Sequence, residues 1–362
     1  MIDRRKFLGQ TLASASGIAL STSAFSNIIV PSQNKKLGVA LVGLGYYSTD
    51  VLAPALQMTD HCELRGIVTG TPAKAEVWQQ KYSISDRNIY NYDTIGEVAN
   101  NPDIDVLYVV LPPSMHAEYS IKAAEAGKHI WCEKPMAMTV DECQNMIDAA
   151  DKNNVKLSIG YRLQHEPNTQ QLIQLTKTKA YGKVQTVDVK AGYQENRTNH
   201  WKQQKAMGGG VMYDMGVYPL NAARYATQME PIAVTARAST NRPKIYHEVE
   251  EIMEFDLEFP GGTTADCIAS FGKSLNSLMV DCSNGWYKLE PFQGYRGVKG
   301  VTSDGKLLND TIPNQQAKQM DDDALAIIND QPMLVPGEEG LKDIRVVEAV
   351  YRSVAKNDKV MI

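Results

Sequence analysis

The fold of this chain is decided by the stretch Lys36-Leu-Gly-Val-Ala-Leu-Val-Gly-Leu-Gly45. Its apolar residues predict a buried β-strand, and the glycines at positions 43 and 45 predict a tight turn directly after that strand. A helix is expected over residues 51–58, with Pro54 near its first turn, where proline is tolerated. Gly43-x-Gly45-x-x-Ser48 is typical of a loop whose backbone N–H groups hold a pyrophosphate, although an ordinary tight turn has the same glycines.

Strands and helices alternate from this loop to residue 158. Apolar runs predict three further strands, and periodic segments between them predict two helices (residues 64–69, 106–111 and 129–132; residues 73–82 and 117–126). Gly127 is a helix stop, and Thr139 with Glu142 forms a capping box that opens another helix. This alternation predicts a parallel, doubly wound sheet, so we assign residues 35–158 to a dinucleotide-binding domain.

The pattern changes after residue 158. Apolar and polar residues alternate in several segments, as expected for antiparallel strands with one face in water (residues 184–190, 233–238, 251–263 and 264–271). Two closing helices are expected near residues 319–329 and 340–356. The predicted fold class is α/β: an N-terminal doubly wound parallel sheet (Rossmann) plus a C-terminal α+β domain with a mainly antiparallel open sheet. We assign residues 159–362 to this second domain, for substrate binding and oligomerisation.

The first 34 residues have the pattern of an export signal. Arg4, Arg5 and Lys6 precede a stretch without charge that is rich in small residues and too weakly apolar for a membrane span. Arg-Arg-x-Phe-Leu resembles the twin-arginine signal, which carries proteins already folded, and this predicts a periplasmic or exported protein. An ordinary N-terminal segment is the alternative, and the cleavage point is not defined by the pattern.

Size, charge and cysteine content set further bounds. The chain has 362 residues, which is long enough for two domains. Its formal net charge of −5 argues against nucleic acid or an anionic membrane as partner. The five cysteines are odd in number and have no Cys-x-x-Cys spacing, so neither a disulfide framework nor a zinc site is expected. No His, Asp or Glu cluster has metal spacing, and no metal is predicted.

Two further segments identify a family. Gly127-Lys-His-Ile-Trp-Cys-Glu-Lys134-Pro135 follows the glycine loop, and Gly208-Gly-Gly-Val-Met-Tyr-Asp214-Met-Gly-Val-Tyr218 follows later in the chain. In this order and spacing the three segments resemble the glucose–fructose oxidoreductase branch of the Gfo/Idh/MocA family, from about Lys36 to the C-terminus. The resemblance implies nicotinamide-dependent hydride transfer to and from a sugar, and a homo-oligomer (dimer or tetramer) formed through the open face of the second sheet.

The resemblance implies that Lys134, Asp214 and Tyr218 are catalytic. Oxidation of a sugar hydroxyl needs a proton acceptor, a nearby cation and a rigid geometry. Tyr218 suits the first role if Lys134 lowers the pKa of its phenol, and Asp214, four residues earlier, would share a helix face with Tyr218. Many relatives have His where this chain has Tyr218. Taken singly, each residue also reads as an ordinary loop lysine, helix carboxylate or half-buried aromatic residue.

The segment after the second strand, Val68-Thr69-Gly70-Thr71, lacks the carboxylate that binds the ribose diol of NAD. Hydroxyls with Lys74 one turn on favour NADP, with NAD the less favoured choice; alternatively, Lys74 is a solvated helix residue. Tyr161 is expected beside the nicotinamide. The residues predicted to bind the cofactor are Gly43, Gly45, Tyr46, Tyr47, Thr69, Thr71, Lys74, Leu111, Pro112, His116, Glu133, Lys134, Arg162, Trp201 and Lys202.

Some of these positions have a second interpretation or depart from the family pattern. His116 is equally a helix cap, and Glu133 a residue that holds its loop. Lys202 stands where the family has arginine, and lysine lacks the planar fork of that residue. The arm that covers the cofactor in glucose–fructose oxidoreductase is here limited to residues 27–35.

The function predicted from the sequence is that of an exported NADP-dependent sugar oxidoreductase. Hydride would pass from the anomeric carbon of an aldose to bound NADP, and a ketose such as fructose would recycle the cofactor. The alternatives are an NAD(P)-dependent glycosidase with transient redox chemistry, an aldose dehydrogenase or reductase with exchangeable cofactor, and a non-catalytic subunit. Tyr218 and the missing carboxylate count against the glycosidase. The sugars themselves are not identified by the sequence.

Overall fold

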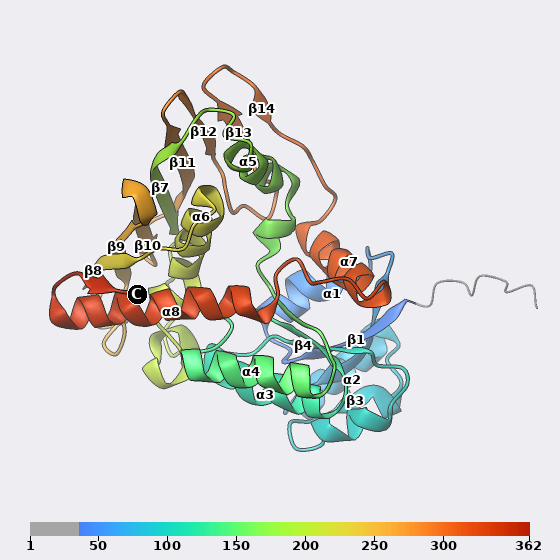
Figure 1. The fold of residues 1–362 in the computed structure, drawn as a ribbon. Helices are drawn as coiled ribbons and strands as arrows, with labels where there is room; N and C mark the ends of the chain where they lie inside the picture. The colour runs from blue at the N-terminus through green and yellow to red at the C-terminus, as the bar shows by residue number, and fades with distance from the viewer. Residues whose placement is uncertain (1–35) are drawn as a thin grey trace, which may run out of the picture. The chain divides into compact units, whose positions relative to one another are not determined.

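Six parallel strands form the N-terminal sheet, in the order β3-β2-β1-β4-β5-β6 (Figure 1). The computed structural model describes residues 36–362, so the export signal predicted in residues 1–34 lies outside the described residues. The strands are β1 (Leu37–Val42), β2 (Cys62–Val68), β3 (Ile89–Tyr90), β4 (Val106–Val109), β5 (His129–Cys132) and β6 (Leu157–Ile159). The predicted parallel sheet is confirmed, and its order reverses between β1 and β4, where such sheets bind ligands.

Two helices of this half begin four residues earlier than the sequence predicts. A π-helical turn over Tyr47–Leu52 continues into α1 (Ala53–Leu56), whereas the predicted helix began at residue 51. Helix α3 (Pro113–Glu125) begins at a proline, whose fixed φ suits the first helical position, and not at residue 117. Helix α2 (Pro72–Tyr82) also begins at a proline, and the predicted capping box opens α4 (Val140–Lys152).

Both faces of the parallel sheet are buried, because β1 sends alternate side chains into two different cores. Ala40 and Val42 belong to one core, while Val39 and Leu41 belong to the other. Helix α7 (Gln315–Ile328), from near the end of the chain, lies beside α1 and contributes Met320 to the second core (Figure 1). The near-continuous apolar runs of these strands follow from this double burial.

The C-terminal sheet has nine strands, in the order β14-β13-β12-β11-β7-β10-β9-β8-β15. β7 and β10 pair in parallel, and the other neighbouring strands pair antiparallel, so the predicted mainly antiparallel sheet is confirmed. The strands are β7 (Val184–Gly192), β8 (Ala233–Ser239), β9 (Ile252–Glu258), β10 (Thr264–Ser270), β11 (Leu275–Cys282), β12 (Gly285–Leu289), β13 (Gly300–Thr302), β14 (Leu307–Leu308) and β15 (Val360–Met361).

One face of this second sheet is covered by helices. On β9, Met253, Phe255 and Leu257 point to the buried side, while Glu254 and Asp256 are exposed. Helix α6 (Val217–Thr227) packs on β7 and β10, and α8 (Gly337–Lys356) packs on β8 and also on α4 of the first half (Figure 1). The sequence did not predict α5 (Pro167–Lys177) or strands β3, β6 and β11 to β15, and for α6 it predicted only that Asp214 and Tyr218 share a helix face.

Short helical turns connect these elements. The 3-10 turns span Asp86–Asn88, Ile95–Asn100, Arg162–His165, Trp201–Gln203, Lys205–Met207 and Pro260–Gly262, and a second π-helical turn spans Met212–Gly216. All five cysteines are buried and free. Within residues 36–362, we find no helix long and apolar enough to cross a membrane and no group of three or more His, Cys, Asp or Glu side chains placed to hold a metal ion.

An ion cluster centred on the buried pair Arg224–Asp343 joins α6 to α8. The side chain of Arg224, which is 4% exposed, donates to Asp343 Oδ1 at 2.6 Å, to Glu339 Oε2 at 2.9 Å and to Glu230 Oε2 at 2.6 Å. Removing the guanidinium leaves Asp343 buried without its cation. We therefore expect Arg224→Gln to lower the free energy of unfolding by about 3–5 kcal/mol, measured by denaturant titration.

The same substitution at a surface ion pair provides the control. Arg352 Nη1 lies 3.8 Å from Glu348 Oε2, and both side chains are more than one-third exposed (46% and 35%). Arg352→Gln is therefore expected to change the free energy of unfolding by less than about 1 kcal/mol. Equal effects of the two substitutions would contradict the role assigned to the Arg224 cluster.

Candidate active site

A cavity of about 560 Å³ lies at the carboxyl ends of the parallel strands. The segments after β1, β2, β4 and β5 form one side of it, and residues from the C-terminal half form the other. The predicted residues that line it are Gly43, Gly45, Tyr46, Tyr47, Thr69, Thr71, Lys74, Leu111, Pro112, Glu133, Lys134, Trp201, Lys202, Asp214 and Tyr218. Two distant segments of sequence thus meet in one site.

The glycine loop that lines the cavity fits a dinucleotide phosphate group. Gly43 has φ +96°, and a Cβ there would lie 2.6 Å from the Val110 carbonyl oxygen, so the turn requires glycine. A Cβ on Gly45 would meet nothing within 4 Å, which leaves the backbone open to a ligand. Ser48, in place of a third glycine, donates from Oγ to the Gly43 carbonyl oxygen at 2.6 Å and braces the loop.

The residues after β2 form a hydroxyl-rich wall beside this loop. The Thr71 N–H donates to Thr69 Oγ1 at 3.2 Å, and Lys74 Nζ donates to the Leu44 carbonyl oxygen at 3.1 Å. Among the residues that line the cavity, the carboxylates are Glu133 and Asp214, which belong to segments away from β2. A phosphate beside Thr69, Thr71 and Lys74 would therefore meet hydroxyls and an ammonium group.

Lys134, Asp214 and Tyr218 come together in the wall of the same cavity. Lys134 Nζ donates to the Asp214 carbonyl oxygen at 2.7 Å and lies 3.8 Å from Asp214 Oδ1. The same ammonium group lies 4.5 Å from the centroid of the Tyr218 ring. Lys134 therefore faces the ring of Tyr218 while it is held by Asp214.

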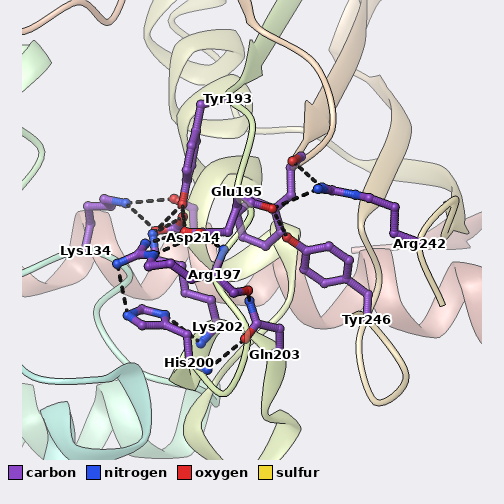
Figure 2. A network of polar contacts seen from close by, with 11 residues as sticks. Lys134, Tyr193, Glu195, Arg197, His200, Lys202, Gln203, Asp214, Arg242 and Tyr246 are labelled. Atoms are coloured by element: carbon purple, nitrogen blue, oxygen red, sulfur yellow. Dashed lines mark hydrogen bonds and ion pairs between the residues drawn. The ribbon is translucent and has the colours of Figure 1, made fainter. Parts of the chain in front are cut away.

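Asp214 is clamped between two lysines (Figure 2). Its Oδ2 accepts a hydrogen bond from Lys202 Nζ at 2.6 Å and lies 3.1 Å from the hydroxyl of Tyr193. Burial by itself would raise the pKa of Asp214, but Lys202 and Lys134 outweigh it and lower that pKa to about 2. Lys202 therefore keeps Asp214 ionised, a role that does not need the planar fork of an arginine.

A π-helical turn, absent from the sequence prediction, carries Asp214 into the site. Asp214 lies in the turn Met212–Gly216, and Tyr218 is the second residue of α6 directly after it. Glu250 Oε1 accepts from the Met212 N–H at 2.9 Å, and Gly210, at φ +104°, leaves room for that carboxylate. π-Helical turns are frequent at functional sites, where they change the direction of a helix.

The protonation of Tyr218 differs from the sequence expectation. Burial raises the pKa of Tyr218, and Arg162 is the group that most opposes this rise, while Glu133 and Asp214 add to it. From the sequence, we expected Lys134 to lower this pKa. Lys134 faces the ring of Tyr218, and its ammonium group is engaged by Asp214, which explains the difference.

Glu133 holds the loop that carries Lys134. The hydroxyl of Tyr108 donates to Glu133 Oε1 at 2.6 Å, and burial raises the pKa of this carboxyl. A Cβ on Gly160 would lie 2.8 Å from Glu133 Oε1, so the glycine makes room for the side chain. The arrangement agrees with a structural role for Glu133, although the residue also lines the cavity.

Three predicted residues lie behind the cavity wall. His116 is buried, with its ring nitrogens 2.7 Å from the carbonyl oxygens of Pro135 and Leu111, so it joins the segments after β4 and β5. The side chain of Arg162 is also buried, and Tyr161 lies in the hydrophobic core. None of the three lines the cavity in the described part of the chain.

Sequence reasoning missed four polar or aromatic residues of the lining: Tyr92, Arg197, His200 and Tyr295. Arg197 Nε donates to Glu195 Oε1 at 2.8 Å, and Arg197 Nη1 lies 3.2 Å from His200 Nε2 (Figure 2). These two residues belong to a polar run directly before Trp201 and Lys202, and this run could have been recognised as part of the predicted cofactor site. Tyr92 and Tyr295 stand in loops without any periodic pattern.

Two sequence families match this chain. Residues 37–161 match an oxidoreductase family with an NAD-binding Rossmann fold, and residues 169–288 match the GFO/IDH/MocA C-terminal domain. The crystal structure of aldose-aldose oxidoreductase from Caulobacter crescentus, complexed with glycerol, is 38% identical, with a TM-score of 0.87 over 91% of this chain and 100% of that chain. The chain belongs to the GFO/IDH/MocA family of oxidoreductases.

Other relatives agree with this assignment. D-xylose 1-dehydrogenase [NADP(+)] from Haloarcula marismortui is 27% identical over 333 residues, which are 87% of this chain and 90% of that protein. Levoglucosan dehydrogenase, solved with NADH and levoglucosan, is 20% identical with a TM-score of 0.79 over 91% of this chain and 100% of that chain, and shows the shared fold. The protein is therefore an oxidoreductase with a dinucleotide-binding fold, as the family resemblance implied.

Proposed function

We propose that this protein is an NADP-dependent sugar oxidoreductase that moves hydride between the anomeric carbon of an aldose and NADP held in the cavity. The observation that carries the proposal is one cavity lined both by the glycine loop Gly43–Gly45 and by Lys134, Asp214 and Tyr218. The similarity to an aldose-aldose oxidoreductase and to an NADP-dependent xylose dehydrogenase supports a sugar as substrate.

The residues divide the chemistry between them. NADP held by the glycine loop and the segment after β2 would supply the acceptor for the hydride that leaves the anomeric carbon. As the hydroxyl O–H bond breaks, Tyr218 Oη takes the proton, and the sugar leaves as a lactone. Lys134 places a positive charge beside the reacting oxygen, and Asp214 holds Lys134 through the contacts at 2.7 and 3.8 Å.

A second sugar is proposed to reoxidise the cofactor. In this half-reaction Tyr218 returns the proton to the carbonyl oxygen as hydride reaches the carbonyl carbon. The similarity to an aldose-aldose oxidoreductase favours a second aldose over a ketose such as fructose as the acceptor. We further propose that the protein acts outside the cytoplasm, after export by the signal in residues 1–34, and that it is a homo-oligomer.

The test starts with purified protein and no added cofactor. Reduced-nicotinamide absorbance is recorded while an aldose is added, followed by a second aldose or fructose. A rise and then a fall support a retained cofactor that cycles between two sugars. A response that needs added NADP points to an exchangeable cofactor. Turnover of a nitrophenyl glycoside without net redox change would replace the proposal with the glycosidase.

The choice of NADP is tested at Thr71. This residue is the N-cap of α2, a position that Asp also suits, so Thr71→Asp adds a carboxylate beside Lys74 without removing a favourable cap type. Because that carboxylate repels a ribose phosphate and binds a ribose diol, we expect the NADP/NAD ratio of kcat/KM to fall about 10-fold or more. Thr71→Ser is the control and is expected to keep the ratio. An unchanged ratio in Thr71→Asp would place the ribose elsewhere.

A further inference from the structure

Arg162 is a buried cation whose side chain does not line the cavity. It begins the 3-10 turn Arg162–His165, directly after the crossover from β6, and is 2% exposed. Its Nη1 donates to the side-chain oxygen of Gln315 on α7, and its Nη2 donates to the Gln293 carbonyl oxygen at 2.7 Å. Gln315 also donates to the Gly294 carbonyl oxygen at 3.0 Å, so one side chain fixes the guanidinium and the neighbouring loop.

Three tyrosines gather around this guanidinium. Arg162 Cζ lies 4.5 Å from the ring centroid of Tyr295 and 5.9 Å from that of Tyr218, and the rings of Tyr295 and Tyr47 are 6.3 Å apart. Tyr47 comes from the glycine-loop helix, Tyr218 from α6 and Tyr295 from the loop after β12. All three tyrosines line the cavity. Arg162, Tyr47, Tyr218 and Tyr295 are called the Arg162 cluster below.

We propose that Arg162 is a positioning residue for hydride transfer: its positive charge lets Tyr218 hold the anionic form that takes the proton from the sugar hydroxyl. This inference rests on the proposed function. Arg162 acts through Tyr218, because its own side chain is buried and does not line the cavity, whereas the three tyrosines of the cluster do.

The charges around Tyr218 explain why Arg162 is required. Glu133 and Asp214 both oppose a negative charge on the phenol, and so do the neighbouring phenols of Tyr47 and Tyr295 once ionised. Lys134 stands over the ring of Tyr218 and is held by Asp214. Arg162 has a buried Nε without a hydrogen-bond partner among the described residues, and its two other nitrogens are fixed by Gln315 and Gln293.

The two directions of hydride transfer depend on Arg162 in different ways. Oxidation of the aldose needs Tyr218 without its proton, whereas reduction of a carbonyl needs Tyr218 with it. Loss of the cation therefore favours the protonated phenol and slows oxidation selectively. A substitution that merely disturbed the shape of the site would slow both directions.

The first measurement reports on Tyr218 itself. The absorbance of ionised tyrosine is titrated in the purified protein and in its Tyr218→Phe variant, and the difference isolates Tyr218. The titration is repeated with Arg162→Gln and with the double variant Arg162→Gln/Tyr218→Phe. We expect the midpoint of Tyr218 to rise by about 1–3 pH units, since an opposite charge within a few ångströms lowers an acid's pKa by that much. Arg87→Gln, at a surface ion pair with Asp103, is the control and is expected to leave the midpoint unchanged.

The second measurement compares the two half-reactions in single turnover at neutral pH. Arg162→Gln is expected to slow aldose oxidation about 10- to 1000-fold, because a rise of about 1–3 units in the pKa of Tyr218 lowers its ionised fraction at neutral pH about tenfold per unit, while carbonyl reduction changes less than about 3-fold. Arg162→Lys, which keeps the charge, is expected to shift the midpoint by less than about one unit.

Two results would overturn the inference. One is an unchanged Tyr218 midpoint in Arg162→Gln. The other is equal slowing of both half-reactions in Arg162→Gln. If Arg162→Gln does not fold, equal slowing of both half-reactions in Arg162→Lys is the result that overturns the inference. The proposed function fails separately, if the unmodified protein transfers no hydride from any aldose, because the titration of Tyr218 still reports on Arg162 in that case.

Discussion

Replacing Tyr218 with phenylalanine is expected to lower the rate of hydride transfer by about 10²–10⁴-fold, the range that general acid–base groups contribute. The substitution removes one oxygen atom and keeps the ring that lies 4.5 Å from Lys134 Nζ. Binding of NADP is expected to change little, since the glycine loop and the segment after β2 are untouched. Single-turnover absorbance of reduced nicotinamide measures the rate, and a binding titration measures the affinity for NADP.

Tyr225 provides the matched control for this prediction. It lies on α6, seven residues after Tyr218, and its buried hydroxyl has no hydrogen-bond partner within residues 36–362. Tyr225→Phe therefore removes the same atom from the same helix and is expected to leave the rate unchanged. A Tyr218→Phe variant with full activity would exclude Tyr218 as the proton acceptor.

Replacing Lys134 with methionine is the second large effect that we expect. Lys134 Nζ is held 2.7 Å from the Asp214 carbonyl oxygen, and the side chain is 12% exposed, so its charge acts in a site shielded from water. Methionine keeps most of the length of the side chain and removes the charge. Since a charge-stabilising donor in such a site contributes this much, kcat is expected to fall about 10²–10³-fold.

The control for Lys134→Met is Lys122→Met. Lys122 is a partly exposed residue of α3 that pairs with Glu118, and the loss of such a pair has little effect on stability. Steady-state kinetics with an aldose and NADP compare the two variants with the unmodified protein. If Lys134→Met raised KM and kept kcat, Lys134 would contribute to binding and not to the chemical step.

Much of the fold was predictable because its signals are local. Three of these signals each depend on a few adjacent residues: the apolar run of β1 with Gly43 and Gly45, the capping box of α4, and the alternating strand β9. The helix after the glycine loop was predicted four residues late, because a π-helical turn has no periodic signature in a short polar segment. Strands β11 to β15 are short or have weak alternation, and their pairing defines them more than their composition does.

The candidate site divides in the same way. The spacing within the Lys134 segment and the Asp214–Tyr218 segment is a property of the sequence, and both segments line the cavity. The contact of Lys202 with Asp214 joins residues twelve positions apart through a loop and a π-helical turn. Arg197 and His200 belong to a recognisable polar run, but neither the direction of their loop nor that of the loop carrying Tyr295 is encoded by a local pattern.

The sequence by itself determined the two kinds of sheet, the glycine loop, the absence of a carboxylate after β2 and the candidate set Lys134, Asp214 and Tyr218. These features depend on side-chain type and on spacing along the chain. The tertiary structure decided which charges act on which groups. Asp214 contacts both Lys134 and Lys202, and Arg162 lies near the ring of Tyr218. Electrostatic interaction depends on distance in space and on burial, and the folded chain alone brings Arg162 near a tyrosine fifty-six residues away.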